Sequence, residues 1–331
     1  MELDLLHPAE FGLNEYFGFD RYMRYRVPVN AGGPCPSFHK VLEEDGKWKL
    51  FLDDWGIRRR ALKNSFSMDE YLEHPVKNRA DWEEYKKRLD PGSPERFPEH
   101  WHELAALYRQ RDYPLSIFRM VGFLHFPRYM MGFENLMLAY YDQPELIMDM
   151  LDYWCEFNIT LAGKVLKDVK PDWVTIGEDM AYKGSSMVSP EMFRKFMLPF
   201  YKRLTGFLRK NGVDVIYVDS DGYVHELIPL WIEGGVNGTW PLEVAAGNDL
   251  LKLRKEYPDF ILSGGIDKIA IAKGKAAIEK ELYSKLPYLL PQGGYIPSID
   301  HVPPEDISLD NWTCYAQLKK KLIEEFPPRR R

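Results

Sequence analysis

Residues 173–179 read WVTIGED and residues 214–222 read DVIYVDSDG, so each is a short run of β-branched and aromatic residues that ends in carboxylates. The segment between them, 190–209, has the signature of a helix, because Ser189 suits the N-cap and Pro190 the first helical position. Pro199 predicts a kink or a break inside this helix, since proline has no N–H to donate. A strand, a helix and a second strand in this order predict a βα unit with parallel strands.

The same alternation continues on both sides of this unit. Further strands are predicted at 115–121, 235–239, 260–263 and 294–299, and further helices at 248–255 and 275–286. From residue 173 onward the strand starts lie roughly 20 to 40 residues apart, which is typical of a (β/α)8 TIM-type barrel. An open doubly wound sheet has the same local signature and stays an alternative. No GxGxxG or P-loop pattern follows a strand, which argues against the nucleotide-binding versions.

The first hundred residues have a different character. They contain one predicted strand, 48–52, and one polar helix, 77–89. The helix places three residues at helical spacing on its inner face, and they are Trp82, Tyr85 and Leu89. We therefore predict that residues 1–100 form an N-terminal elaboration packed on the barrel. Residues 101–331 would form the barrel core with a C-terminal helix, all in one structural domain.

Composition excludes several classes of protein. The chain of 331 residues has a net charge of −6 and no long basic run apart from Arg329 to Arg331, so nucleic-acid binding is not expected. Three cysteines without a CxxC pair argue against a disulfide framework and against an all-cysteine zinc site. The N-terminus lacks the features of a signal peptide, and no stretch approaches the ~20 apolar residues needed to span a bilayer. A cytoplasmic protein acting on a small-molecule substrate is the expectation.

Carboxylates follow five of the six predicted core strands. In barrels of this type the functional groups come directly after the strands, at the C-terminal face. The acidic residues at these ends are Glu178, Asp179, Asp219, Asp221, Glu243, Asp267 and Asp300. Taken alone, Glu243 and Asp267 also fit ordinary turn chemistry, because Asp and Glu after a strand are common there.

Asp219 and Asp221 are the strongest candidates in this set. Two carboxylates two residues apart repel each other and need a cation, an arginine or a proton between them. His301 can complete the group, with Glu178 as a fourth ligand, and such a set suits zinc or a harder divalent cation. A metal-free acid–base or substrate-binding site is the alternative. In either case Asp179 and His301 are the predicted catalytic residues.

The remaining predicted site residues line the cleft. His125 follows the strand at 115–121, and Tyr182 follows the carboxylates at 178–179. Trp240 and Glu243 follow the strand at 235–239. Aromatic side chains and a carboxylate at these positions are expected to contact the substrate.

These same residues resemble the uroporphyrinogen decarboxylase superfamily, which also contains corrinoid-linked methyltransferases. The resemblance runs from about residue 177 to residue 311. It rests on short motifs in a fixed order, which are Gly177-Glu178-Asp179, Ser189-Pro190-Glu191-Met192-Phe193, Pro199-Phe200, Asp219 to Gly222, Ile232 to Val236, Gly264-Gly265-Ile266-Asp267, Gly293 to Ile296, His301 and Asp310-Asn311. The resemblance implies a (β/α)8 barrel with its cleft at the C-terminal face.

The methyltransferase branch implies a specific chemistry at the strand ends. Its members carry His-x-Cys-Gly where this chain has Asp219 to Gly222, and a later cysteine where this chain has His301. In that branch these residues hold a zinc ion that activates a thiol. Oxygen and nitrogen donors instead favour a harder cation, or a polar substrate such as a methoxylated compound or a folate. The branch further implies a partner corrinoid protein that brings its cobamide to the barrel mouth.

Two other functions stay open. A decarboxylase of a porphyrinogen or another polycarboxylate would need positive groups around the cleft. The candidates are Arg21, Arg24, Arg26 and the run Arg58 to Arg60. A ligand-binding barrel without turnover is the third possibility, because loss of the soft ligands also fits a protein with no catalytic role.

Overall fold

The centre of the molecule is a parallel sheet of six strands. The computed structural model describes residues 16–19, 26–63 and 68–329. All five pairings in the central sheet are parallel, and its spatial order β12-β11-β10-β9-β6-β5 follows the chain. The strands are β5 (Ser116–Val121), β6 (Trp173–Gly177), β9 (Val215–Asp219), β10 (Gly238–Trp240), β11 (Ile261–Ile266) and β12 (Tyr295–Ile299). This confirms an α/β fold and all six predicted core strands.

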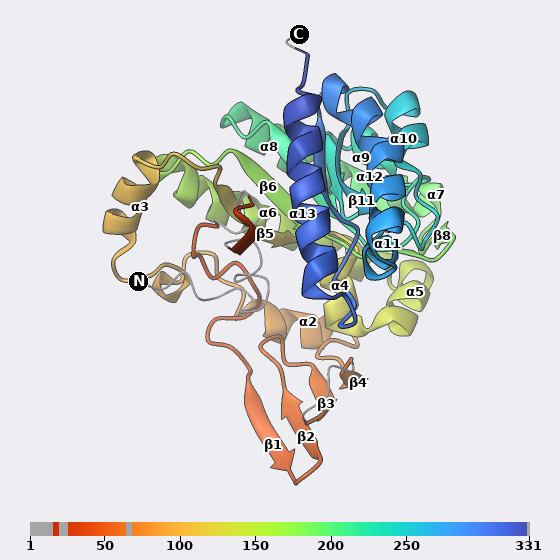
Figure 1. Ribbon diagram of the computed structural model, residues 1–331. Coiled ribbons are helices and arrows are strands. Elements are labelled where there is room, and N and C mark those ends of the chain that lie inside the picture. The colour runs from red at the N-terminus through yellow and green to blue at the C-terminus, as the bar shows by residue number, and fades with distance from the viewer. Residues whose placement is uncertain (1–15, 20–25, 64–67, 330–331) are drawn as a thin grey trace.

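Helices connect each strand to the next and surround the sheet (Figure 1). In chain order they are α4 (His125–Met131), α5 (Phe133–Asp142), α6 (Pro144–Asp168), α7 (Pro190–Met192), α8 (Leu198–Lys210), α9 (Ile228–Glu233), α10 (Leu250–Glu256), α11 (Lys268–Ala272), α12 (Lys275–Leu289) and α13 (Leu309–Glu325). The predicted break near Pro199 is confirmed. A π-helical turn, Phe193–Met197, separates α7 from α8 just before the proline, where the missing N–H interrupts the helical bonding pattern.

The central sheet has two edges, β5 and β12, so the described strands do not complete the predicted eight-stranded barrel. Arg26 makes a single parallel bridge to Ser116 beside β5. Near the other edge, the Phe19 ring lies 3.7 Å from Lys319 Nζ on α13, and this nitrogen also lies 3.5 Å from the carbonyl oxygen of Pro297 in β12. Described N-terminal residues therefore pair with one edge strand, β5, and contact α13 beside the other, without forming a further strand.

The N-terminal part contains a separate antiparallel sheet that projects from the body (Figure 1). Its strands are β1 (Lys40–Glu44), β2 (Trp48–Leu52), β3 (Arg58–Leu62) and β4 (Glu70–Glu73), and α2 (Arg79–Lys86), a 3-10 turn (Pro94–Arg96) and α3 (Trp101–Arg109) follow. The Trp55 ring, in the turn between β2 and β3, lies 5.1 Å from the Tyr129 ring of α4. Because α4 starts just after β5, this contact anchors the small sheet at the C-terminal end of the central strands.

The hydrophobic core lies between the central sheet and its helices. The Phe126 and Trp154 rings stack with centroids 4.2 Å apart, and the buried Trp82 and Tyr85 of α2 join the same core, as predicted from their helical spacing. In the described part of the chain, no helix has both the length and the apolar character needed to span a membrane.

Candidate functional site

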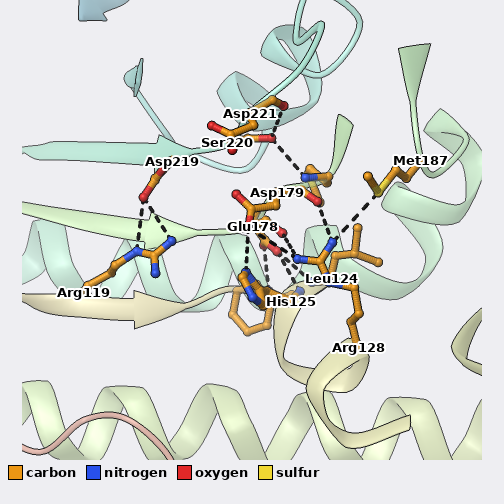
Figure 2. A network of polar contacts seen from close by, with 12 residues as sticks. Arg119, Leu124, His125, Arg128, Glu178, Asp179, Met187, Asp219, Ser220 and Asp221 are labelled. Carbon is orange, nitrogen blue, oxygen red and sulfur yellow. Dashed lines mark hydrogen bonds and ion pairs between the residues drawn. The ribbon is translucent and has the colours of Figure 1, made fainter. Parts of the chain in front are cut away.

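Polar side chains from β5, β6, β9 and β12 gather at the C-terminal ends of these strands. Figure 2 shows the part of the cluster that β5, β6 and β9 contribute, with Arg119, His125, Asp179 and Asp219 directed toward one another. The side chains of Arg119 and Asp179 each keep 36% of their surface exposed. Solvent therefore reaches this group even though it lies among the central strand ends.

Arg119 and Asp219 form an ion pair across the sheet. Arg119 Nε and Nη2 lie 3.2 and 3.1 Å from Asp219 Oδ2. The guanidinium passes over β6 at Gly177, where a Cβ atom would lie only 2.4 Å from Nη2. Burial raises the pKa of Asp219 to about 6, even though the charge of Arg119 lowers it. A carboxyl group with this pKa can exchange a proton near neutral pH.

Arg26 adds a second guanidinium beside this pair. Burial lowers the pKa of Arg26, the charge of Arg119 lowers it further, and the charge of Asp219 acts in the opposite direction. Its Nε is buried and makes no hydrogen bond within the described residues. Two guanidinium groups thus lie near Asp219, so this part of the site favours an anionic group on a ligand.

Of the other predicted arginines, the structure describes only the run from Arg58 to Arg60, and this run lies in the small antiparallel sheet. Arg21 and Arg24 lie outside the described residues. The run from Arg58 to Arg60 forms part of β3 in the small antiparallel sheet, where Arg59 pairs with Asp69 at 2.7 Å and Arg60 with Glu70. Local carboxylates therefore satisfy two of the three arginines of β3.

Asp179 lies between His125 and Arg128. Its Oδ2 is 3.6 Å from His125 Nδ1 and 3.6 Å from Arg128 Nη2, while its carbonyl accepts a hydrogen bond from Arg128 Nη1 at 2.8 Å. The backbone of Asp179 is left-handed, with φ 46°, a conformation that costs energy for a residue with a side chain and is concentrated at functional sites. Burial and the nearby Asp221 raise the pKa of Asp179.

His125 is a neutral imidazole in this environment. Burial lowers its pKa to about 2, and the charges of Arg128 and Arg119 act in the same direction. Nδ1 is buried and makes no hydrogen bond within the described residues. The imidazole therefore lies buried beneath Asp179, with Nδ1 facing the carboxylate at 3.6 Å.

Asp221 and His301 form a second pair. Asp221 Oδ2 lies 3.3 Å from His301 Nε2, and the two side chains keep 44% and 34% of their surface exposed. The hydrogen bond that Asp221 accepts from His301 is the main cause that raises the pKa of His301. The charge of Glu243 adds to it, while burial and the charge of Lys268 oppose it. Since β10 and β11 separate β9 from β12 in the sheet, this contact shows that the strand ends curve toward each other.

Glu178, predicted as a fourth metal ligand, is held by hydrogen bonds inside the fold. It is fully buried and accepts hydrogen bonds from the N–H groups of Phe123, Leu124 and His125 at 2.7, 2.9 and 3.1 Å. The hydroxyl of Tyr201 donates to the same carboxylate. These four donors use the acceptor positions of Glu178 and fix the turn from β5 into α4.

The predicted metal set of Glu178, Asp219, Asp221 and His301 is not brought together. The described residues contain no group of three or more His, Cys, Asp or Glu side chains placed to hold a metal ion. Asp219 is paired with Arg119, and Asp221 with His301. As placed here, these side chains do not provide the three protein ligands of a catalytic zinc site.

The other predicted substrate contacts lie around the same strand ends. Glu243 Oε2 accepts the N–H of Gly222 at 2.9 Å, so its carboxylate links two loops of the site. Trp240 ends β10 and is half-buried. Tyr182 lies on a two-residue strand, β7 (Ala181–Tyr182), which pairs with β8 (Ser185–Ser186), and 55% of its surface is exposed.

Sequence reasoning missed three basic residues of the site. They are Arg119, Arg128 and Lys268. The sequence does contain an indication for Arg119, because a single charged residue in the otherwise uncharged strand β5 predicts a functional role. Arg128 follows His125 by three residues, which places both on one face of α4. Lys268 follows the predicted turn residue Asp267, and no pattern distinguishes it from a surface lysine.

Comparisons with known proteins agree with this architecture. A family model described as uroporphyrinogen decarboxylase (URO-D) matches residues 65–322. A methyltransferase from Methanosarcina mazei has a similar structure, with TM-score 0.58 and 16% identity over 94% of this chain and 83% of the other. A B12-independent methionine synthase from Shewanella sp. W3-18-1 matches with TM-score 0.46 and 8% identity, over 96% of this chain and 87% of the other.

The sequence identity between this chain and each matched protein determines what the match shows. The Methanosarcina mazei methyltransferase shows a likeness of fold alone, because its identity to this chain is only 16%. A search of curated proteins finds no match. The family model, in contrast, spans most of the chain and includes the ends of all six central strands. This chain belongs to the uroporphyrinogen decarboxylase family.

Proposed function

We propose that this chain is a methyl-transfer enzyme of the corrinoid-linked branch that works without a bound metal, with Asp221 and His301 as its proton-transferring pair. The contact of 3.3 Å between Asp221 Oδ2 and His301 Nε2 carries the proposal. In the methyltransferase branch, the corresponding positions hold a zinc ion that activates a thiol. A carboxylate–imidazole pair suits a different substrate, whose oxygen or nitrogen gains or loses a proton during transfer.

Asp221 and His301 would supply the proton transfer that such a reaction needs. A cobamide on a partner corrinoid protein would supply the cobalt that accepts or donates the methyl group. When a methyl ether is cleaved, the bond between oxygen and methyl carbon breaks and the oxygen keeps the electron pair. His301 would give that oxygen its proton, and Asp221 would stabilise the imidazolium beforehand. In the reverse direction the neutral imidazole would accept the proton of the methyl acceptor.

Arg119 and His125 would bind and orient the substrate. Arg119 directs Nε and Nη2 at one oxygen of Asp219, and Arg26 lies nearby, so a substrate carboxylate would find positive charge there. His125 would act from beneath, by orienting the half-buried carboxylate of Asp179 toward a neutral polar group of the substrate. A methoxylated aromatic carboxylate has both features and matches the polar substrates that the oxygen-rich site favours.

A corrinoid assay tests this proposal directly. The purified protein is mixed under anaerobic conditions with reduced cobalamin and a panel of methoxylated aromatic carboxylates, and formation of methylcobalamin is followed by absorbance. We expect turnover by the wild type and a loss of roughly 100-fold or more in His301→Gln, because general acid catalysis contributes on this scale. His225→Gln is the matched control, since His225 also pairs with a carboxylate, Glu256, at 2.6 Å.

Two results would contradict the proposal. One is the absence of any absorbance change with every substrate, in both the demethylation direction and the methylation direction from methylcobalamin. The other is wild-type turnover by His301→Gln. Turnover that depends on added zinc and survives in His301→Gln would point back to metal chemistry at other residues.

A carboxy-lyase is the second candidate, and the pair of guanidinium groups beside Asp219 favours it. Arg26 and Arg119 would hold a substrate carboxylate. The bond to a second carboxylate would break with release of CO2, and the carbon that keeps the electrons would take a proton from Asp219. Release of CO2 from a porphyrinogen with acetate side chains, lost in Arg119→Gln, would support this reaction. Ligand binding with neither activity would favour a non-catalytic barrel.

A further inference from the structure

A second group of charges lies behind the Asp221–His301 pair. Lys268 is the first residue of α11, and its Nζ lies 3.4 Å from Asp300 Oδ1 and 3.9 Å from Glu243 Oε1. The Lys268 side chain is 17% exposed and that of Asp300 is 1% exposed. The lysine therefore joins two carboxylates in a largely buried position, where solvent screens charges weakly.

Each of these carboxylates is attached to a loop that carries one member of the pair. Glu243 Oε2 accepts the N–H of Gly222, the residue next to Asp221. Asp300 directly precedes His301, and its Oδ2 accepts the N–H of Val244 at 2.9 Å.

Lys268 also fixes Asp300 from its own backbone. Its N–H donates to Asp300 Oδ1 at 3.1 Å, in addition to the contact of the ammonium group. One residue thus connects the end of β12, the loop after β10 and, through Glu243, the loop after β9.

The pair needs such support. Asp221 and His301 come from strand ends that are three places apart in the sheet, and both side chains are substantially exposed. An exposed ion pair contributes little and does not hold two loops together by itself. The buried hydrogen bonds from Lys268 to the Asp300 carboxylate are charge-assisted and stronger, and the ammonium group also lies within ion-pair distance of Glu243. The rigid connection therefore lies in the buried group behind the pair.

We propose that Lys268 is the positioning residue of the Asp221–His301 pair, which it holds in contact by joining Glu243 to Asp300. This inference rests on the proposed acid–base function of the pair. It assigns Lys268 no contact with substrate. In the absence of Lys268, the two loops separate and His301 loses its partner.

The charges around His301 give this proposal a distinct signature. Asp221 is the main cause of its raised pKa, Glu243 adds to it, and Lys268 lowers it. If Lys268 acted only through its charge, its removal would raise the pKa of His301 further. If Lys268 positions the pair, its removal separates Asp221 from His301, and the pKa falls toward the ordinary value of about 6.5.

The experiment is an NMR titration of the full chain labelled with 13C-histidine, with the His301 signal assigned from its loss in His301→Gln. We expect Lys268→Met to lower the pKa of His301 toward its ordinary value and Lys268→Arg to restore it. Lys285→Met is the matched control. Lys285 is equally enclosed and pairs with Glu281 on α12, without contacting Glu243 or Asp300. If Lys268→Met does not fold, Lys268→Gln takes its place.

A rise of the His301 pKa in the lysine variant, or no change, would overturn the proposal. A fall that also occurs in Lys285→Met would overturn it too, because it would reflect general loosening of the fold. The titration needs no substrate and no corrinoid. It therefore tests the positioning role even if the proposed methyl transfer is not found, and loss of methyl transfer alone leaves its outcome unchanged.

Discussion

Asp219 connects the chemistry of the site to the stability of the fold. Its pKa of about 6 lies above the ordinary value of 3.8 because the carboxyl group is buried. The folded protein thus holds this proton more tightly than the unfolded chain does. The resulting stability is fully present below pH 3.8 and is lost as the pH rises through 6.

Asp219→Asn tests this dependence, because an amide resembles the protonated carboxyl in shape and charge. We expect the wild type to lose about 3 kcal/mol of unfolding free energy relative to Asp219→Asn between pH 4 and pH 7.5, at about 1.4 kcal/mol per pKa unit. Urea denaturation of both proteins across this range measures the difference. A difference that is constant with pH would show that Asp219 keeps an ordinary pKa in the fold.

Glu178 should matter for stability more than for turnover. We expect Glu178→Gln to cost about 3 kcal/mol, because the amide replaces an acceptor with a donor opposite four buried donors. Tyr201→Phe removes one of the four and should cost about 1 to 2 kcal/mol. Thermal and urea unfolding measure both. Equal stability of Glu178→Gln and the wild type would argue against the structural role of Glu178.

Glu178 and Asp179 also show how far the sequence predicts the direction of single side chains. Both are acidic and both follow β6, and the sequence places both in the candidate site. The left-handed backbone of Asp179 directs its side chain to the site, while Glu178 turns inward to Tyr201 and the start of α4. These directions depend on partners far along the chain, which strand-end patterns do not contain.

At the scale of elements, the loops after β6 and β9 are tightly interlocked. Met180 donates its N–H to Ser220 Oγ at 3.0 Å, and Tyr223 donates its N–H to the carbonyl of Tyr182 at 3.0 Å. Gly222 has φ 83°, and a Cβ there would lie 2.6 Å from the backbone of Ala181. This contact fixes the backbone directly beside Asp221.

Gly222→Ala should therefore destabilise the protein and impair the site. Gly184→Ala is the matched control, because Gly184 has φ 97° but a Cβ there would meet no atom of the described residues within 4 Å. We expect about 1 to 2 kcal/mol for Gly184→Ala from backbone strain alone. Gly222→Ala should cost at least about 2 kcal/mol more, because a rigid backbone blocks the new methyl group. Equal losses in unfolding free energy would show that the loops separate easily.

The elements that sequence patterns predict well are those buried on both sides. The core strands are short runs of mostly apolar residues, and the six predictions agree with the structure to within a few residues at each end. β1, β3 and β4 were missed because their residues are largely charged and exposed. In β3, Arg58 to Arg60 pair with β2 and β4. A run of three arginines does not have the alternation of apolar and polar residues that predicts a strand.

At the scale of the whole molecule, the parallel sheet was predictable and its closure was not. The spacing of the strands reflects repeated βα units, but the number of strands that join the sheet depends on long-range contacts. The N-terminal residues contribute one bridge at Arg26 and side-chain contacts at Phe19, and neither has a strand pattern. The site depends on the same kind of contact, since Asp221 and His301 meet across two intervening strands.

Phe19 should stabilise the β12 edge more than the centre of the sheet. We expect Phe19→Ala to lower the unfolding free energy by about 2 kcal/mol, because it removes an aromatic contact with Tyr315 and a cation–π contact with Lys319. Hydrogen exchange should become faster in β12 before it does in β9. Tyr16→Ala is the control, since 71% of Tyr16 is exposed. Uniform acceleration across the sheet would contradict this local role.

The passage of Arg119 over Gly177 has a consequence for how this family diverges. A side chain at position 177 and a guanidinium from position 119 would occupy the same space, so the two positions are not free to vary independently. A relative that keeps an arginine at 119 should keep glycine at 177, and one with a larger residue at 177 should carry a shorter side chain at 119. The residues at positions 119 and 177 would then identify the family members that retain the Arg119–Asp219 ion pair.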